Sequence, residues 1–172
     1  MSLTKAEGLR GNEFETYFNK LPQVSSLFLK VCSIDQIPSE IPIKHFVLFN
    51  LSKQHEEGSH WALLLRYSKH KLEIFNSLGS DNLNYLNGYL QFDKHFKIDF
   101  NKKSVQSLTS TYCGFFCIYF AIFRILNFDM TMEHVLEDIF TSNLIKNDLI
   151  VSQFCNNILT SVNDDFFCFH DI

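Results

Sequence analysis

The sequence has few residues of the kinds that mark several common classes of protein. Its 172 residues include three prolines, six glycines and one tryptophan. Neither GxxxxGK nor GxGxxG occurs, so no glycine-rich loop is present that could hold a phosphate. The net charge of -4 argues against a broad basic surface for nucleic acid. These absences exclude the common nucleotide-binding motifs.

Long apolar segments are also absent. The longest one, Gly114 to Leu126, is interrupted by Arg124 and is too short to span a bilayer. The N-terminal residues MSLTKAEGLRGNEFE are polar and do not form the apolar core of a secretory signal. We therefore expect an intracellular protein that is not secreted and has no membrane partner.

The cysteines give no metal or disulfide pattern. There are five, an odd number with irregular spacing, which fits a reducing compartment. Cys113 and Cys117 stand four residues apart, but no C-x₂-C pair occurs and no H-x₃₋₅-H pair lies near them. We expect no metal site.

The chain shows no repeat and no low-complexity linker, which predicts a single domain over residues 1–172. Residues 1–40 carry the least pattern: residues 1–20 read as an amphipathic helix or a leader, and prolines mark a loop-rich stretch after them. Strands are predicted at 45–51 and 95–100, with a β-hairpin between them. The hairpin consists of HWALLLRY and KLEIF, joined by SKH.

Helices are predicted in the second half of the chain and, more weakly, at 81–91. The run CGFFCIYFAIFRIL is apolar on nearly all sides, so it should form a buried helix. Amphipathic helices are expected near 131–141 and 144–160, while the tail DDFFCFHDI has no clear assignment. Hairpin strands with segregated helices predict an α+β fold with a mixed central sheet flanked by helices.

One cysteine lies where a nucleophile could be activated. Cys113 stands at the predicted start of the buried helix, where free backbone N–H groups and the helix dipole favour a thiolate. Gly114 follows and would let a substrate backbone approach the sulfur. The alternative is a small buried hydrophobic residue, the commonest role of a free cysteine.

A histidine and an asparagine should meet at one end of the hairpin. If Arg66 pairs with Lys71, position 60 falls opposite position 77, so His60 comes within diagonal reach of Asn76. The Asn76 amide oxygen could then fix one imidazole nitrogen and leave the other facing a thiol. Taken alone, each residue is more often structural.

A glutamine and a group of lysines are further candidates for functional residues. Gln106 precedes Cys113 by seven residues in the same polar loop, so its amide could donate to an oxyanion together with the Cys113 backbone N–H. A solvated loop glutamine is the alternative. Four lysines could form a local basic patch that binds nucleic acid: Lys94, Lys97, Lys102 and Lys103. The alternative is that these loop side chains are only solvated, as such side chains usually are.

Three segments together resemble a known family. GSHWALLLRY, then LEIFNSLGSDN, then SVQSLTSTYCGFFCIYFAIF, is similar to the adenovirus maturation protease (adenain) family of cysteine proteases. Similar genes occur in virophages and polinton-type transposons, and SUMO-specific (Ulp-type) proteases are more distant relatives. The resemblance covers residues 44–126 well and 127–160 faintly.

The resemblance implies an adenain-like, papain-like thiol protease that cleaves after glycine-containing motifs. By residue-to-residue correspondence, Cys113 is the nucleophile, His60 the base, Asn76 the third member and Gln106 the oxyanion donor. Trp61 matches the tryptophan that helps to shape the substrate groove, although core packing is its alternative. The implied substrates are capsid and core precursors of a virus or transposon. The protein would then act as a monomer inside the host cell, in the viral factory or nucleus, and in the virion.

The chain departs from this family at three points. Adenain has a carboxylate where this chain has Asn76, and a neutral partner stabilises an imidazolium less. The stretch KHFKIDFNKKS contains no cysteine that could tether an activating peptide, and an acidic chain does not suit a DNA activator. No cofactor is therefore expected to be required. Two alternatives stay open: a protease that removes SUMO or ubiquitin-like proteins, and a catalytically inactive binding module with the same fold.

Overall fold

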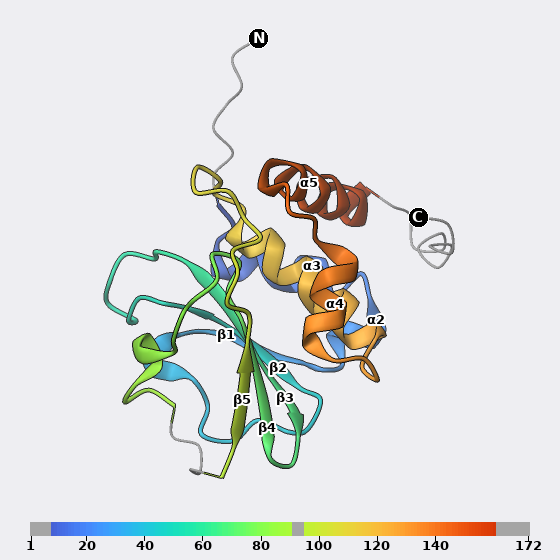
Figure 1. Cartoon of the computed structure of the whole chain (residues 1–172). Helices are drawn as coiled ribbons and strands as arrows, with labels where there is room; N and C mark the ends of the chain where they lie inside the picture. Colours follow the sequence, from blue (N-terminus) through green and yellow to red (C-terminus); the bar gives the residue numbers. More distant parts are fainter. Residues whose placement is uncertain (1–7, 91–94, 161–172) are drawn as a thin grey trace.

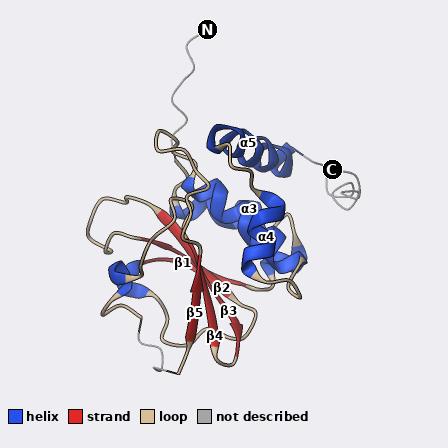
Figure 2. Cartoon of the chain, in the orientation of Figure 1, coloured by secondary structure: helices blue, strands red, loops and turns tan. Residues whose placement is uncertain are grey.

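The computed structural model has an α+β fold in which most helices gather on one side of a mixed five-stranded sheet (Figures 1 and 2). The structure describes residues 8–90 and 95–160. The strands lie side by side in chain order. The two outer pairs are parallel and the two inner pairs antiparallel. Their bounds are β1 Phe28–Ser33, β2 Phe46–Asn50, β3 Trp61–Ser68, β4 Lys71–Phe75 and β5 Lys97–Phe100.

Both faces of the central strands are buried, which explains why they read as almost continuous apolar runs. Phe46, Leu63 and Phe75 face the helices and belong to the larger core. Their neighbours Val47 and Leu64 point to the opposite face, into a second core closed by loops. The sheet is thus the middle layer between two apolar cores.

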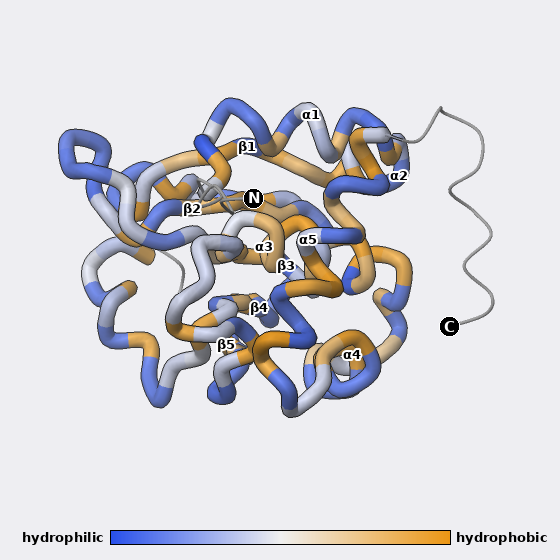
Figure 3. Tube along the Cα trace, turned by 90° about the horizontal axis from the view of Figure 1, so that it is seen from above, coloured by the Kyte–Doolittle hydropathy of each residue, from blue (hydrophilic) through white to orange (hydrophobic). Residues whose placement is uncertain are grey.

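Helix α3, Cys113–Leu126, is the central helix of the larger core. Seen from above, its trace is largely hydrophobic and is surrounded by other elements (Figure 3). It contacts β3 on one side and α5 on another. The other helices are α1 Phe14–Phe18, α2 Pro22–Ser25, α4 Met132–Ile139 and α5 Leu144–Thr160, with 3₁₀ turns η1 Gly11–Glu13, η2 Ile34–Gln36 and η3 Asn84–Leu86. No helix within the described residues is long and apolar enough to cross a membrane.

The strands and helices predicted between residues 45 and 160 are confirmed to within a few residues at each end, with one exception. The predicted helix at 81–91 is wrong, because only the short turn η3 forms there. Gly88 has a positive φ of 85°, and Leu86 is the only buried residue of the turn, so a helix would gain little burial. The prediction also missed β1, which lies in the proline-bounded stretch that read as loop.

The hairpin register differs by one residue from the assumed one. Arg66 pairs with Leu72, and Lys71 pairs with Ser68. The register shifts between Arg66 and Ser68, so Tyr67 is an additional residue, as in a β-bulge. At the N-terminus, η1 and α1 replace the single helix or leader considered for residues 1–20. Residues 1–7 and the tail from 161 lie outside the described part.

Candidate active site

Three elements end or begin where the candidate residues lie. His60 directly precedes β3, Asn76 directly follows β4, and Cys113 is the first residue of α3. Because β3 and β4 are antiparallel neighbours, the start of one lies beside the end of the other. The fold therefore brings the hairpin end to the N-terminus of the central helix, which packs on β3.

His60 and Asn76 are in direct contact, as the hairpin argument predicted. The His60 Nε2 atom lies 2.8 Å from Asn76 Oδ1. The same oxygen accepts the Leu78 backbone N–H at 3.0 Å. A backbone N–H can only donate, so the atom that faces both groups must be the amide oxygen, and Nε2 must carry a proton. The unprotonated Nδ1 of the neutral ring is then available for a second group.

The Cys113 thiol lies at the start of β3. Backbone N–H groups of Trp61, Gly114 and Cys113 itself act on the sulfur and lower its pKa. Trp61 is the neighbour of His60 in the chain, so the sulfur and the imidazole belong to the same small region. Cys113 is only partly buried, whereas the other described cysteines are buried: Cys32, Cys117 and Cys155.

Burial works against a charged pair in the free protein. It raises the pKa of Cys113 above its usual value, despite the opposing N–H groups. It also lowers the pKa of His60, and the Asn76 hydrogen bond offsets this only in part. The net direction for Cys113 is opposite to the sequence-based expectation that the helix N-terminus would favour the thiolate. Both shifts disfavour a thiolate–imidazolium pair before a substrate binds.

Gln106 is buried, with 2% of its surface exposed, and is not the solvated loop residue that was its alternative. Its Nε2 donates to the Ser110 carbonyl at 2.9 Å, three residues before Cys113. Its Oε1 accepts from the Ser77 hydroxyl at 2.5 Å. The amide is thus held beside the loop that leads into the nucleophile, and Nε2 has a second N–H to offer.

Two residues that the sequence reasoning missed support the end of β4. Asn101, which follows β5, accepts the Asn76 backbone N–H at 2.9 Å and donates to the Asn76 carbonyl at 2.6 Å. It also donates to the Lys103 carbonyl at 3.1 Å. Ser77 is fully buried. A signal was present in the sequence, because Asn101 directly follows the strand predicted at 95–100, but its hydrogen-bond partner could not be inferred.

The turn after Asn76 leaves no space for a side chain. Gly79 has a φ of 69°, and its N–H donates to the Asn76 carbonyl at 2.8 Å. A Cβ atom there would lie 2.4 Å from the Lys102 carbonyl oxygen and 2.7 Å from the Ser104 nitrogen. Glycine is therefore required both by the backbone conformation and by the close approach of the loop that carries Gln106.

The N-terminal segment covers Trp61 and Gly114. The Trp61 indole donates to the Leu9 carbonyl at 2.8 Å and packs edge-on against Phe14, with ring centroids 5.0 Å apart. Gly114 is buried, and a Cβ there would lie 3.0 Å from Leu9 and 3.1 Å from Phe14. The absence of a side chain at Gly114 thus admits the N-terminal segment, where the sequence suggested room for a substrate backbone.

Tyr85 of η3 lies near Asn76. Its hydroxyl is buried and makes no hydrogen bond of normal geometry. The Asn76 amide is nevertheless close enough to lower the pKa of Tyr85, against a larger rise caused by burial. The phenol is therefore a neighbour of the Asn76 amide without being a firm partner.

Two further candidate groups are the potential metal ligands and the four lysines. Within residues 8–90 and 95–160, no cluster of three or more histidine, cysteine or acidic residues could hold a metal ion. Lys97 pairs with Asp99 at 3.3 Å, whereas Lys102 and Lys103 are exposed. Lys94 of the proposed basic patch lies outside the described residues.

No protein-family model matches the chain, and no curated protein sequence matches it significantly.

Proposed function

We propose that the chain is a cysteine endopeptidase, built on an adenain-like, papain-like version of the α+β fold. Cys113 is the nucleophile, His60 the general base and Asn76 the residue that orients His60. Gln106 and the Cys113 backbone N–H stabilise the oxyanion. The main support is one arrangement: His60 Nε2 is bound to Asn76 at 2.8 Å, while the Cys113 thiol meets the N–H of the residue next to His60.

The reaction begins from two neutral groups. His60 Nδ1 takes the thiol proton as the Cys113 sulfur attacks the scissile carbonyl carbon, whose oxygen becomes an oxyanion. Because the Asn76 oxygen accepts from Nε2–H, it favours the imidazolium that forms. The tetrahedral intermediate collapses, the C–N bond breaks, and His60 gives its proton to the leaving amine. A thioester remains on Cys113.

Water completes the cycle. His60 removes a proton from the water molecule as its oxygen attacks the thioester carbonyl. The C–S bond breaks, the acid product leaves, and the proton on His60 returns to the Cys113 thiolate. Both groups are then neutral again, so the cycle needs no cofactor.

The proposed substrates are capsid or core precursors of a virus or transposon, cut after glycine-containing motifs. This proposal comes from the resemblance of the three segments around His60, Asn76 and Cys113. A protease of this kind would act inside the host cell and in the virion.

The test compares the full chain with Cys113→Ala on candidate capsid precursors and on a glycine-containing peptide. We expect wild type to cleave and the variant to lose at least about 10⁴-fold in kcat/KM, because the nucleophile is gone. Circular dichroism should show the same fold in both. Equal cleavage by both proteins would refute the proposal. Preference for a SUMO–fluorophore conjugate over the peptide would instead favour a deconjugating protease.

An inactive binding module is the second candidate, and one observation favours it. Burial raises the pKa of Cys113 and lowers the pKa of His60, and both shifts disfavour a thiolate–imidazolium pair in the free protein. The alkylation rate distinguishes the two. A protease should react with iodoacetamide at Cys113 faster than at the other four thiols near neutral pH, because His60 would act as a base for this thiol. Uniformly slow alkylation would support the binding module.

A further inference from the structure

We infer that Ser77 is a positioning residue that sets the orientation of the Gln106 amide, and with it the N–H that faces a substrate oxyanion. The inference deepens the proposed function and rests on it, because an oxyanion forms only if Cys113 attacks a carbonyl. Neither the catalytic roles of the other residues nor the sequence pattern gives Ser77 any part.

Contacts at both ends of the Gln106 amide decide how it is oriented. The Ser110 carbonyl can only accept a hydrogen bond, so the amide atom 2.9 Å from it must be Nε2. The other amide atom, Oε1, then faces Ser77, whose hydroxyl donates to it at 2.5 Å. With both ends bound, neither a flip of the amide nor a rotation of the side chain is possible without losing a hydrogen bond.

Water cannot replace the serine. Ser77 is 0% exposed and Gln106 is 2% exposed. If the hydroxyl were removed, Oε1 would be left as a buried acceptor without its partner, which is unfavourable because no water replaces the lost donor. The amide would relieve this by turning toward another donor, and Nε2 would then move away from the loop before Cys113.

The backbone of Ser77 holds the same segment independently of its side chain. The Ser77 carbonyl accepts the N–H groups of Val105 at 2.8 Å and Gln106 at 3.1 Å. It also accepts from the Ser104 hydroxyl at 3.2 Å. The loop is thus attached to the end of β4 without the serine hydroxyl, whose separate effect is to orient the amide. Because Ser77 follows Asn76, one strand end orients both the base and the oxyanion donor.

A double-mutant cycle tests this role in the full chain. We expect Ser77→Ala to lower kcat about tenfold on the glycine-containing peptide, with KM within about twofold, since a misdirected donor loses part of its effect. In a Gln106→Ala background the same change should alter kcat less than about twofold, because no amide is left to orient. Equal losses in both backgrounds, or no loss in either, would overturn the inference.

Two further variants separate orientation from loop stability. Ser104→Ala is the matched control, because it removes a hydroxyl that binds the Ser77 and Gln106 carbonyls without touching the amide. It should change kcat less than about twofold. Ser77→Cys keeps a weak donor of similar volume and should give an intermediate kcat. A loss in Ser104→Ala as large as in Ser77→Ala would assign the effect to the loop alone.

A readout without catalysis keeps this inference distinct from the proposed function. Hydrogen exchange of the Gln106 side-chain N–H groups, followed by NMR, should be at least about tenfold slower in wild type than in Ser77→Ala. If wild type cleaves nothing yet shows this difference, the protease proposal fails while Ser77 still orients the amide. If exchange is equally fast in both, the orienting role is wrong even in an active enzyme.

Discussion

The two ends of helix α3 are surrounded by different kinds of polar group. At its N-terminus lie uncharged side chains: Cys113, His60, Asn76, Ser77 and Gln106. At the other end Arg124 forms a two-point ion pair with Glu73 of β4, at 2.7 and 3.0 Å. Strand β4 serves both ends, because it contains Glu73 and leads directly into Asn76.

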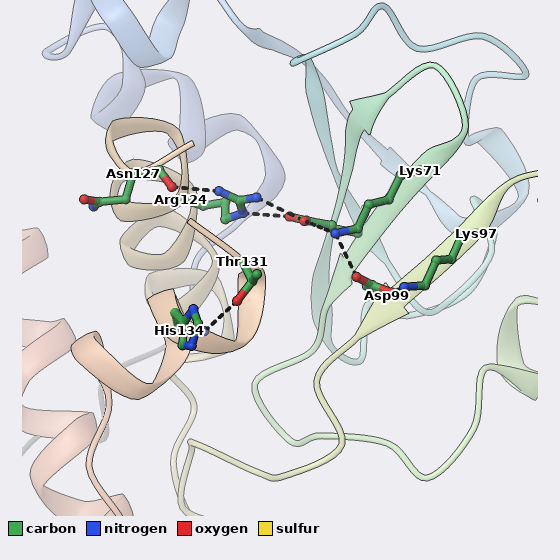
Figure 4. A network of polar contacts seen from close by, with 8 residues as sticks. Lys71, Lys97, Asp99, Arg124, Asn127, Thr131 and His134 are labelled. Carbon is green, nitrogen blue, oxygen red and sulfur yellow. Dashed lines mark hydrogen bonds and ion pairs between the residues drawn. The ribbon is translucent and has the colours of Figure 1, made fainter. Parts of the chain in front are cut away.

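The charged end is a buried network that reaches the surface stepwise (Figure 4). Arg124 and Glu73 are 1% and 0% exposed. Lys71 lies 3.4 Å from Glu73 and 2.8 Å from Asp99, which also pairs with exposed Lys97. Arg124 also donates to the Asn127 carbonyl at 2.9 Å and lies over the rings of Tyr67 and Phe128. Full pairing makes permanent charge tolerable inside the protein.

The comparison teaches that the two ends suit opposite tasks. A permanent, paired charge fixes the position of the helix, because any shift would separate buried opposite charges. A neutral cluster can accept charge that develops only during a reaction, since its donors already point inward. The predictions below break one end at a time.

The largest expected effect is on stability, at the charged end. Arg124→Met should lower the free energy of unfolding by about 3–5 kcal/mol, because it leaves the Glu73 carboxylate buried with only Lys71 beside it. Urea denaturation measures the loss. The double variant Arg124→Met with Glu73→Leu is the control and should recover most of the stability. A loss below about 1 kcal/mol in the single variant would contradict the view that this end anchors the helix.

At the neutral end, adding charge should change activity. Asn76→Asp places a carboxylate beside the imidazole, which should raise the pKa of His60 and oppose the lowering caused by burial. More enzyme then reaches the thiolate–imidazolium state, so kcat/KM at pH 7 should rise about threefold to tenfold. The low-pH limb of the kcat/KM profile, which reports the pKa of the base His60, should move upward.

Asn76→Ala is the matched control for this change. It removes the acceptor from His60 and should lower kcat about tenfold to a hundredfold, with the low-pH limb moving downward. If Asp and Ala shifted the limb in the same direction, the Asn76 side chain would not act through His60.

The neutral end should also make stability depend on pH. Burial holds the pKa of His60 below its unfolded value of 6.5, so the unfolded chain binds more protons as pH falls past that value. Stability is therefore fully present above pH 6.5 and is lost toward the lower folded-state pKa. We expect this contribution to be about 1 kcal/mol between pH 7 and pH 5. Urea titrations of wild type and His60→Gln should diverge over this range; parallel curves would argue against the shift.

The smallest effect is expected where the charged network meets solvent. Lys97 is 76% exposed at its side chain, so its pair with Asp99 is weak. Lys97→Ala should change the free energy of unfolding by less than about 0.5 kcal/mol, and 1 M salt should abolish the difference. A loss of stability comparable with that of Arg124→Met would mean that the ion pairs of the network contribute equally in the core and at the surface.

The local chemistry explains which parts could be predicted from the sequence. Helix α3 was predicted with the bounds it has, because the apolar run begins directly after a polar loop and this change in polarity marks where the helix starts. The contact between His60 and Asn76 was predicted even though the assumed pairing of Arg66 with Lys71 was wrong. Diagonal reach at a hairpin end tolerates a shift of one residue.

Other features depend on long-range contacts that no local pattern shows. Arg124 read as an interruption of an apolar run, since its partner Glu73 lies 51 residues earlier. Ser77 and Asn101 looked like ordinary turn and loop residues, because their partners come from other segments. The contact of Leu9 with Gly114 could be predicted only from the path of the N-terminal segment, where the sequence shows the least regular pattern.

Gly79 gives the molecule a point of vulnerability remote from any reacting atom. A methyl group there would clash with the backbone at Lys102 and Ser104. The clash would separate the segments that contain Asn76 and Gln106. A random screen for inactive variants should accordingly recover position 79, although glycine supplies no functional group. Redesign of the proposed site for new substrates would have to leave that single hydrogen atom in place.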